Sequence, residues 1–137
     1  MIVSIATRAT PDFLALWNQA TGETVKLRGG REVIDAIRQG RSDDELAQRL
    51  VGDQCVWLAR KDDDTLLGFA LCRDHVIELL YVDRPHRRRG VARTMLNTMA
   101  HSANPPVDGL ALPGDRATKS LYESFGWKAR LLTMRGE

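Results

Sequence analysis

The chain has 137 residues, of which 43% are hydrophobic and 28% are charged, and this length and composition suit one folded domain over residues 1–137. Its 20 Lys and Arg against 18 Asp and Glu leave a net charge of only +2, so the chain as a whole is not a polycation built for nucleic acid. No stretch reaches the roughly 20 apolar residues of a membrane helix, so we expect no membrane partner.

The first part of the chain is predicted to be mainly helical. A short β-branched strand over residues 2–6 is followed by an apolar-periodic helix over residues 11–20, which residues 21–23 close. A second helix is expected over residues 31–39, where apolar side chains recur at helical spacing until Gly40 stops it.

A third helix is predicted to begin at Ser42, which forms a capping box with Glu45 three residues later. Two β-rich runs at residues 54–60 and 65–72 then flank three consecutive aspartates, which predicts a hairpin with an acidic turn. The aspartates lack the ligand spacing of an EF-hand loop, so we interpret them as turn residues rather than calcium ligands.

The second half of the chain alternates between strand and helix. A strand over residues 75–82 precedes a helix that begins at Gly90 and stops before Asn104. A short strand at residues 107–112, a helix from the N-cap Asp115 to Phe125 and a last strand at residues 127–134 follow. This order predicts a three-layer or split-sheet α/β arrangement.

Cysteine and histidine usage points away from a metal site. Cys55 and Cys72 stand alone in apolar runs, and the three histidines are scattered, so we expect no metal. The first residues lack the basic and apolar regions of a secretory signal, which favours the cytoplasm.

The segment from Val82 to Ala92 has the layout of an anion site, because a strand, a basic loop and a helix start follow one another. Backbone N–H groups in the first turn of a helix have no intrahelical partners, and the helix dipole is positive there. Gly90 lets an anion approach the backbone closely, and Ala92 adds little bulk. The arginines of this region are Arg84, Arg87, Arg88, Arg89 and Arg93.

A basic run can also be a solvated face or a nucleic-acid patch, so the loop needs its context. The chain has neither the Gly-Lys-Ser/Thr of a nucleotide-hydrolase loop nor a Gly-x-Gly-x-x-Gly dinucleotide motif. The run also lacks interleaved aromatic residues, which disfavours a nucleic-acid partner.

The stretch from Glu78 to Ala92 resembles the signature of the Gcn5-related N-acetyltransferase (GNAT) family: a strand, Arg or Gln, two residues, Gly, one residue, and Gly or Ala. Arg87, Gly90 and Ala92 occupy those places. The resemblance implies that the loop wraps the pyrophosphate of acetyl-CoA, while the strand offers main-chain groups to the pantetheine and the acetyl oxygen. The donor-binding residues that it implies are Leu80, Tyr81, Val82, Arg87, Arg88, Arg89, Gly90, Val91, Ala92, Asp115 and Tyr122.

A second segment, from Asp115 to Trp127, is similar to the family's later helix, which commonly has Asn, then Ala, then Leu-Tyr, and ends in Gly-Phe. Tyr122 matches, whereas Asp115 stands where Asn is usual and Thr118 where Ala is usual. The two motifs and the order of elements imply the GNAT-like α/β fold, a mixed and mostly antiparallel sheet flanked by helices. The implied activity is transfer of an acetyl group from acetyl-CoA to an amine by direct attack in a ternary complex.

Two side chains are candidates for catalysis. Tyr122 is protonated at neutral pH, and in the family this tyrosine commonly donates to the sulfur; plain packing in its helix is the alternative. A main-chain N–H near Val82 is expected to polarise the thioester oxygen. Glu78 is the proposed base, because it interrupts an apolar strand two residues before Leu80 and should share its face, although a salt-bridged glutamate is the alternative. His75 is a weaker candidate.

The acceptor is left open at this point. Charged residues between the first two predicted helices, Glu23 among them, either contact the acceptor or are solvated loop charges. Few residues follow Trp127, which favours an open acceptor site for a small amine or peptide, or one completed by a second subunit of a homodimer. Two rival functions also stand: an acyl-CoA sensor without turnover, and a nucleic-acid module with steep salt dependence.

Overall fold

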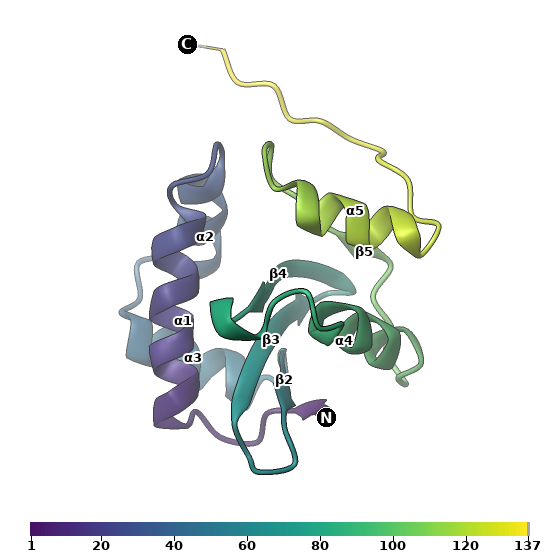
Figure 1. Cartoon of the computed structure of the whole chain (residues 1–137). Coiled ribbons are helices and arrows are strands. Elements are labelled where there is room, and N and C mark those ends of the chain that lie inside the picture. The colour runs from purple at the N-terminus through teal and green to yellow at the C-terminus, as the bar shows by residue number, and fades with distance from the viewer. Residues whose placement is uncertain (137) are drawn as a thin grey trace.

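A mixed sheet in the order β1-β2-β3-β4-β5 forms the centre of the computed structural model, which describes residues 1–136 (Figure 1). The strands are β1 (Ile2–Ile5), β2 (Val56–Arg60), β3 (Leu66–Arg73), β4 (Val76–Val82) and β5 (Asp108–Gly109). The helices are α1 (Pro11–Thr24), α2 (Gly30–Arg38), α3 (Asp43–Gly52), the 3-10 turn η1 (Arg84–His86), α4 (Val91–Ala100) and α5 (Arg116–Ser124).

The sheet has a separate apolar core on each face. β1 to β4 pair antiparallel, and β5 pairs parallel with β4. Helices α1 to α3 cover one face, where the rings of Phe13, Trp17 and Phe69 pack with centroids 5.4 to 6.4 Å apart. On the other face α4 and Tyr122 of α5 pack on Ile77. The predicted α/β fold with a mixed, mostly antiparallel sheet is therefore confirmed.

Helix α1 is longer than predicted. It continues through Gly22 to Thr24 instead of closing at residues 21–23. Thr21 and Thr24 are buried, and the Thr21 hydroxyl donates to the Asn18 carbonyl at 3.1 Å, so tertiary packing and a local hydrogen bond outweigh the weak helix propensity of Thr and Gly. Glu23 consequently lies on the helix and not in a loop.

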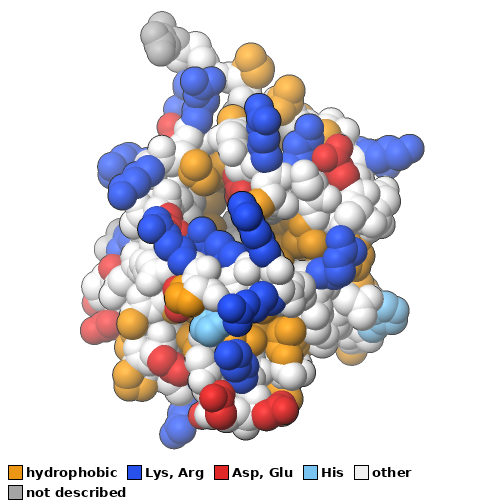
Figure 2. Space-filling view, in the orientation of Figure 1, with side chains coloured by type: hydrophobic (Ala, Val, Ile, Leu, Met, Phe, Trp, Pro, Cys, Tyr) orange, Lys and Arg blue, Asp and Glu red, His pale blue; other side chains and the backbone are white. Residues whose placement is uncertain are grey.

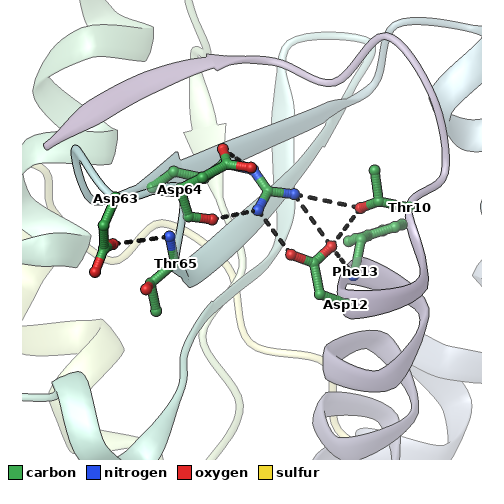
Figure 3. Close-up of polar contacts among 7 residues, drawn as sticks. Thr10, Asp12, Phe13, Asp63, Asp64 and Thr65 are labelled. Carbon is green, nitrogen blue, oxygen red and sulfur yellow. Dashed lines mark hydrogen bonds and ion pairs between the residues drawn. The ribbon is translucent and has the colours of Figure 1, made fainter.

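The start of α1 is tied to the end of β2 by a partly exposed ion pair between Asp12 and Arg60 (Figure 3). Arg60 places Nη1 2.7 Å from Asp12 Oδ2 and Nη2 3.3 Å from Thr10 Oγ1. The same guanidinium donates to the Asp64 carbonyl at 2.9 Å, so the acidic turn is anchored as well. The predicted hairpin and its turn are confirmed.

The predicted C-terminal strand is wrong. Residues 128–136 form neither helix nor strand, and Leu131, Leu132 and Met134 are 78% to 86% exposed. A period-2 apolar pattern becomes a strand only against a neighbour, and β5 has two residues in place of the predicted 107–112. The tail runs away from the sheet (Figure 1). Within residues 1–136 no helix is long and apolar enough to cross a membrane.

Candidate functional site

Strand β4 has one edge that is paired only at its start. β5 pairs with Val76 and Ile77 alone, and beyond them β4 continues to Val82 without a strand on that side in the described residues. The Asp83 N–H bonds the Leu67 carbonyl of β3 at 2.9 Å. Because bonded pairs alternate along antiparallel strands, the main-chain groups of Leu80 and Val82 face the open edge.

Glu78 is the extra residue of a β-bulge in β4. Leu79 pairs with Leu71 and Ile77 pairs with Cys72, so Glu78 has no paired residue on β3. Ile77 and Leu79 accordingly pack into the cores on opposite faces, although they are two residues apart. The sequence prediction that Glu78 and Leu80 share a face assumed that side chains alternate regularly along β4. The bulge interrupts that alternation at Glu78.

The carboxylate of Glu78 is engaged by an arginine. Arg73 contacts it through both Nε and Nη2, with 2.9 Å between Nη2 and Oε2, and the Glu78 side chain is 17% exposed. A bidentate pair of this kind engages both carboxylate oxygens in charge-assisted hydrogen bonds. The geometry favours the salt-bridge alternative, and the base role stays a prediction.

Helix α4 begins without a side-chain cap. Gly90 is its N-cap at φ 79°, and among residues 1–136 no side chain bonds the N–H groups of the first turn. By contrast, Ser42 caps α3 through the Glu45 N–H, as predicted. A methyl group added at Gly90 would meet nothing within 4 Å, so the space beside this N-cap residue is open. Val91 is buried in the core, which leaves only its main chain to face a ligand.

The arginines around α4 differ in what they contact. Glu23 of α1 binds two of them, Arg84 and Arg87. Arg93 donates to Ser124 at 3.1 Å and lies over the ring of Phe125, the residue after α5. Arg88 and Arg89 are exposed and form no ion pair within residues 1–136. Figure 2 shows Lys and Arg side chains in a band across the face that carries η1 and the start of α4.

The ring of Tyr122 lies between Gly109 of β5 and Trp127, which follows α5. This ring stacks on Trp127 at 5.2 Å, and a methyl group at Gly109 would lie 2.7 Å from the Tyr122 hydroxyl oxygen. The side chain is 6% exposed, and its hydroxyl is buried without a hydrogen-bond partner in the described residues. Burial, followed by the charge of Asp115 and by Cys72, raises the Tyr122 pKa well above its usual value.

Asp115 caps α5, as predicted. Its Oδ1 accepts from the Thr118 N–H at 3.2 Å, and its Oδ2 accepts from the Thr118 hydroxyl at 2.7 Å. The two departures from the family pattern therefore bind each other, and a direct contact of Asp115 with a donor stays a prediction.

A shallow groove of about 630 Å³ separates α1 from η1; its lining residues are Asn18, Gln19, Gly22, Glu23, Lys26, Asp83, Arg84 and Pro85. Sequence reasoning missed Gln19, whose amide donates to Tyr81 Oη at 2.7 Å and to Asp83 at 3.0 Å. Gln19 and Glu23 are four residues apart, so extending α1 past Gly22 would have put both on one helix face. Within residues 1–136 no three potential metal-ligating side chains come together.

Comparison with known proteins agrees with this layout. The profile of the acetyltransferase (GNAT) domain family matches residues 23–133. No curated protein matches the chain. Among solved structures, a mutant of the BH1408 protein from Bacillus halodurans has a TM-score of 0.69 and 20% identity, with 100% of this chain and 99% of that chain covered.

Two other solved structures share the fold. Apo YjaB from Escherichia coli has a TM-score of 0.55 and 18% identity, with 90% of this chain and 80% of that chain covered. An aminoglycoside acetyltransferase from an uncultured soil metagenomic sample has a TM-score of 0.53 and 16% identity, with 100% and 99% covered. With the family profile spanning residues 23–133, the chain belongs to the acetyltransferase (GNAT) domain family.

Proposed function

We propose that this protein transfers an acetyl group from acetyl-CoA to an amine acceptor. The observation that carries the proposal is the Tyr122 hydroxyl, which is buried without a partner. A buried hydroxyl left unpaired is unfavourable by about 1–3 kcal/mol, so its presence calls for a ligand atom. A thioester sulfur that reaches the Tyr122 hydroxyl beside Gly109 of β5 would supply that atom.

The donor's charged half suits the start of α4. The uncapped N–H groups beside Gly90 favour a pyrophosphate, and the open space in front of Gly90 leaves room for it. Arg88 and Arg89 add free positive charge. We assign the pantetheine to the main-chain groups of Leu80 and Val82 on the open edge of β4, where amide groups can pair with an extended chain.

The acceptor nitrogen attacks the thioester carbonyl directly, the carbon–sulfur bond breaks, and CoA leaves as the thiolate. In this proposal the Tyr122 hydroxyl donates a hydrogen bond to the sulfur as negative charge develops there. The raised pKa of Tyr122 keeps that hydroxyl protonated throughout the neutral range. A main-chain N–H near Val82 is the proposed partner of the carbonyl oxygen.

An amine of ordinary pKa is protonated at pH 7 and must lose a proton before it attacks. Because Arg73 holds Glu78, we propose that water carries this proton away and that Glu78 supports the bulge. The variant Glu78→Gln should then lower turnover less than about tenfold. A loss of about 10²-fold or more with unchanged acetyl-CoA affinity would restore Glu78 as the base.

The acceptor is proposed to bind in the groove between α1 and η1, whose open form suits a small amine or a peptide.

Exposed Leu131, Leu132 and Met134 are the segment through which a homodimer would form. We propose a cytoplasmic location, which the free thiols Cys55 and Cys72 suit, because a reducing compartment keeps cysteines unpaired.

A sensor that binds acyl-CoA without turnover is the second candidate, because Asp115 and Thr118 replace the usual family residues. Two measurements separate the candidates: calorimetry with acetyl-CoA, and thiol release from acetyl-CoA with a panel of amines and peptides. Binding with thiol release supports the enzyme. Binding without release from any acceptor supports the sensor, and absence of binding refutes both.

A further inference from the structure

Glu23, in the last turn of α1, bridges to the arginine loop from the opposite side of the groove. Its Oε1 lies 2.6 Å from Arg84 Nε, and its Oε2 lies 3.2 Å from Arg87 Nη2. One carboxylate thus serves two guanidinium groups, one with each oxygen. Arg87 is also the first residue of the family signature.

The second anchor of Arg87 is on the open edge of β4. Its Nε donates to the Val82 carbonyl at 2.8 Å, and its guanidinium lies 5.2 Å from the centre of the Tyr81 ring. The proposed function gives this same Val82 main chain to the donor. Held by Glu23, Arg87 therefore covers a main-chain group that an acyl-CoA molecule would use.

The Glu23 carboxylate binds Arg84 and Arg87 in the way that a phosphate group of a ligand would bind them. The Glu23 side chain is 23% exposed, whereas Arg84 is 70% exposed and Arg87 44% exposed. Burial alone would raise the pKa of Glu23, but hydrogen bonds from Tyr81, Arg84 and Arg87 together lower it. The carboxylate is therefore ionised at neutral pH, and both of its partners are exposed enough to reach an anion at the surface.

We propose that Glu23 competes with the phosphates of acyl-CoA for Arg84 and Arg87 and so sets the affinity of the donor site. This inference rests on the proposed function and deepens it. A pyrophosphate carries more charge than one carboxylate and also meets the bare N–H groups of α4, so it wins the arginines when the donor is present.

The exchange has a consequence for the acceptor. Glu23 lines the groove together with Gln19, and once its arginines turn to the donor it presents an unpaired carboxylate there. A carboxylate attracts the ammonium form of an amine. The groove therefore becomes favourable for an amine acceptor after the donor has bound, and the chemical class of the acceptor is cationic.

A purely structural role for Glu23 would have a different signature. If the carboxylate only braced the loop, its loss would weaken both the fold and the donor site. If it competes with phosphate, its loss weakens the free protein but strengthens donor binding. The two measurements then move in opposite directions, which bracing alone does not produce.

The test compares Glu23→Gln with Asp62→Asn, which makes the same change in net charge in the β2–β3 turn, where the Asp62 side chain is 93% exposed. Calorimetry with acetyl-CoA and thermal unfolding without ligand are measured for both variants and the unaltered protein. We expect Glu23→Gln to bind acetyl-CoA about threefold to thirtyfold more tightly and to unfold at a lower temperature. Asp62→Asn should change the affinity by less than about twofold, because an exposed charge so placed is screened.

Equal or weaker acetyl-CoA binding by Glu23→Gln, while the unaltered protein binds, would overturn the competition and leave the proposed function standing. No acetyl-CoA binding by either protein would overturn both. A gain of equal size in Asp62→Asn would show a general charge effect and would also overturn the specific role of Glu23.

Discussion

Replacing Tyr122 by Phe removes one oxygen atom from the centre of the proposed site. The hydroxyl is buried and lacks a partner in the described residues, while the ring remains stacked on Trp127. Since the unpaired hydroxyl carries a desolvation penalty of about 1–3 kcal/mol, the variant should be more stable by about 1 kcal/mol once lost packing is allowed for. For a chain of this length that raises the unfolding midpoint by about 4 °C.

The same variant should be a poor enzyme. Loss of a positioned proton or hydrogen-bond donor lowers turnover by about 10²–10⁴-fold, whereas acetyl-CoA affinity, set mainly at the start of α4, should change little. The assay is thiol release at saturating acetyl-CoA with the best acceptor of the panel, alongside calorimetry and thermal unfolding.

Tyr81→Phe is the matched control, because the chain has two tyrosines and the other one is paired. The Gln19 amide donates to its hydroxyl at 2.7 Å, so removing that oxygen should destabilise the protein by about 0.5–1.5 kcal/mol. Opposite shifts in the two unfolding midpoints are expected. Unchanged turnover in Tyr122→Phe would refute the role in catalysis, and a lowered midpoint would show that the hydroxyl is paired in solution.

Three further predictions test the frame around the site. Gly90→Ala and Gly40→Ala both place a side chain on a residue with positive φ, +79° at Gly90 and +77° at Gly40. Each variant should therefore have a free energy of unfolding lower by about 1–2 kcal/mol, measured by thermal unfolding. Only Gly90→Ala should also weaken acetyl-CoA binding in calorimetry. Gly109→Ala places its methyl group 2.7 Å from the Tyr122 hydroxyl and should lower turnover about 10²-fold, whereas Gly52→Ala, which meets nothing within 4 Å, should not. The hydrogen bond from Arg60, opposed by burial, lowers the pKa of Asp12 to about 2, so stability present above pH 4 should fall as the pH drops toward 2. Because Asp12 is 47% exposed, solvent screening reduces the stability that its lowered pKa contributes to about 1 kcal/mol. In Asp12→Asn, stability measured by denaturation should depend less on pH over the same acidic range.

Local signals predicted local structure well. Ser42 and Asp115 each accept a hydrogen bond from the N–H three residues on, because an N-cap needs only its own turn of helix. Gly90 likewise begins α4 as expected. The junction between β4 and α4, which we propose as the anion site, could therefore be located before any tertiary contact was known.

Features that depend on contacts with another element could not be predicted from the sequence. The apolar run at residues 127–134 has the period of a strand, but pairing requires an edge, and β5 has only two residues. The predicted end of α1 is too early because Thr21 and Gly22 indicate a stop as long as the burial of Thr21 and Thr24 against the core is unknown. The sequence therefore placed Glu23 among loop charges and did not predict its contacts with Arg84 and Arg87, which lie more than 60 residues further along the chain.

Glu78 shows most clearly how one backbone irregularity changes a chemical inference. In a regular strand it would share a face with Leu80, and an isolated carboxylate there would be a reasonable base. The bulge instead separates Ile77 from Leu79 across the sheet and leaves Glu78 beside Arg73. A bulge removes one residue from the ladder, so every side chain before it changes face relative to those after it. The open edge of β4 that follows the bulge, with the main-chain groups of Leu80 and Val82, is therefore a stronger basis for the proposed chemistry than any carboxylate in the strand.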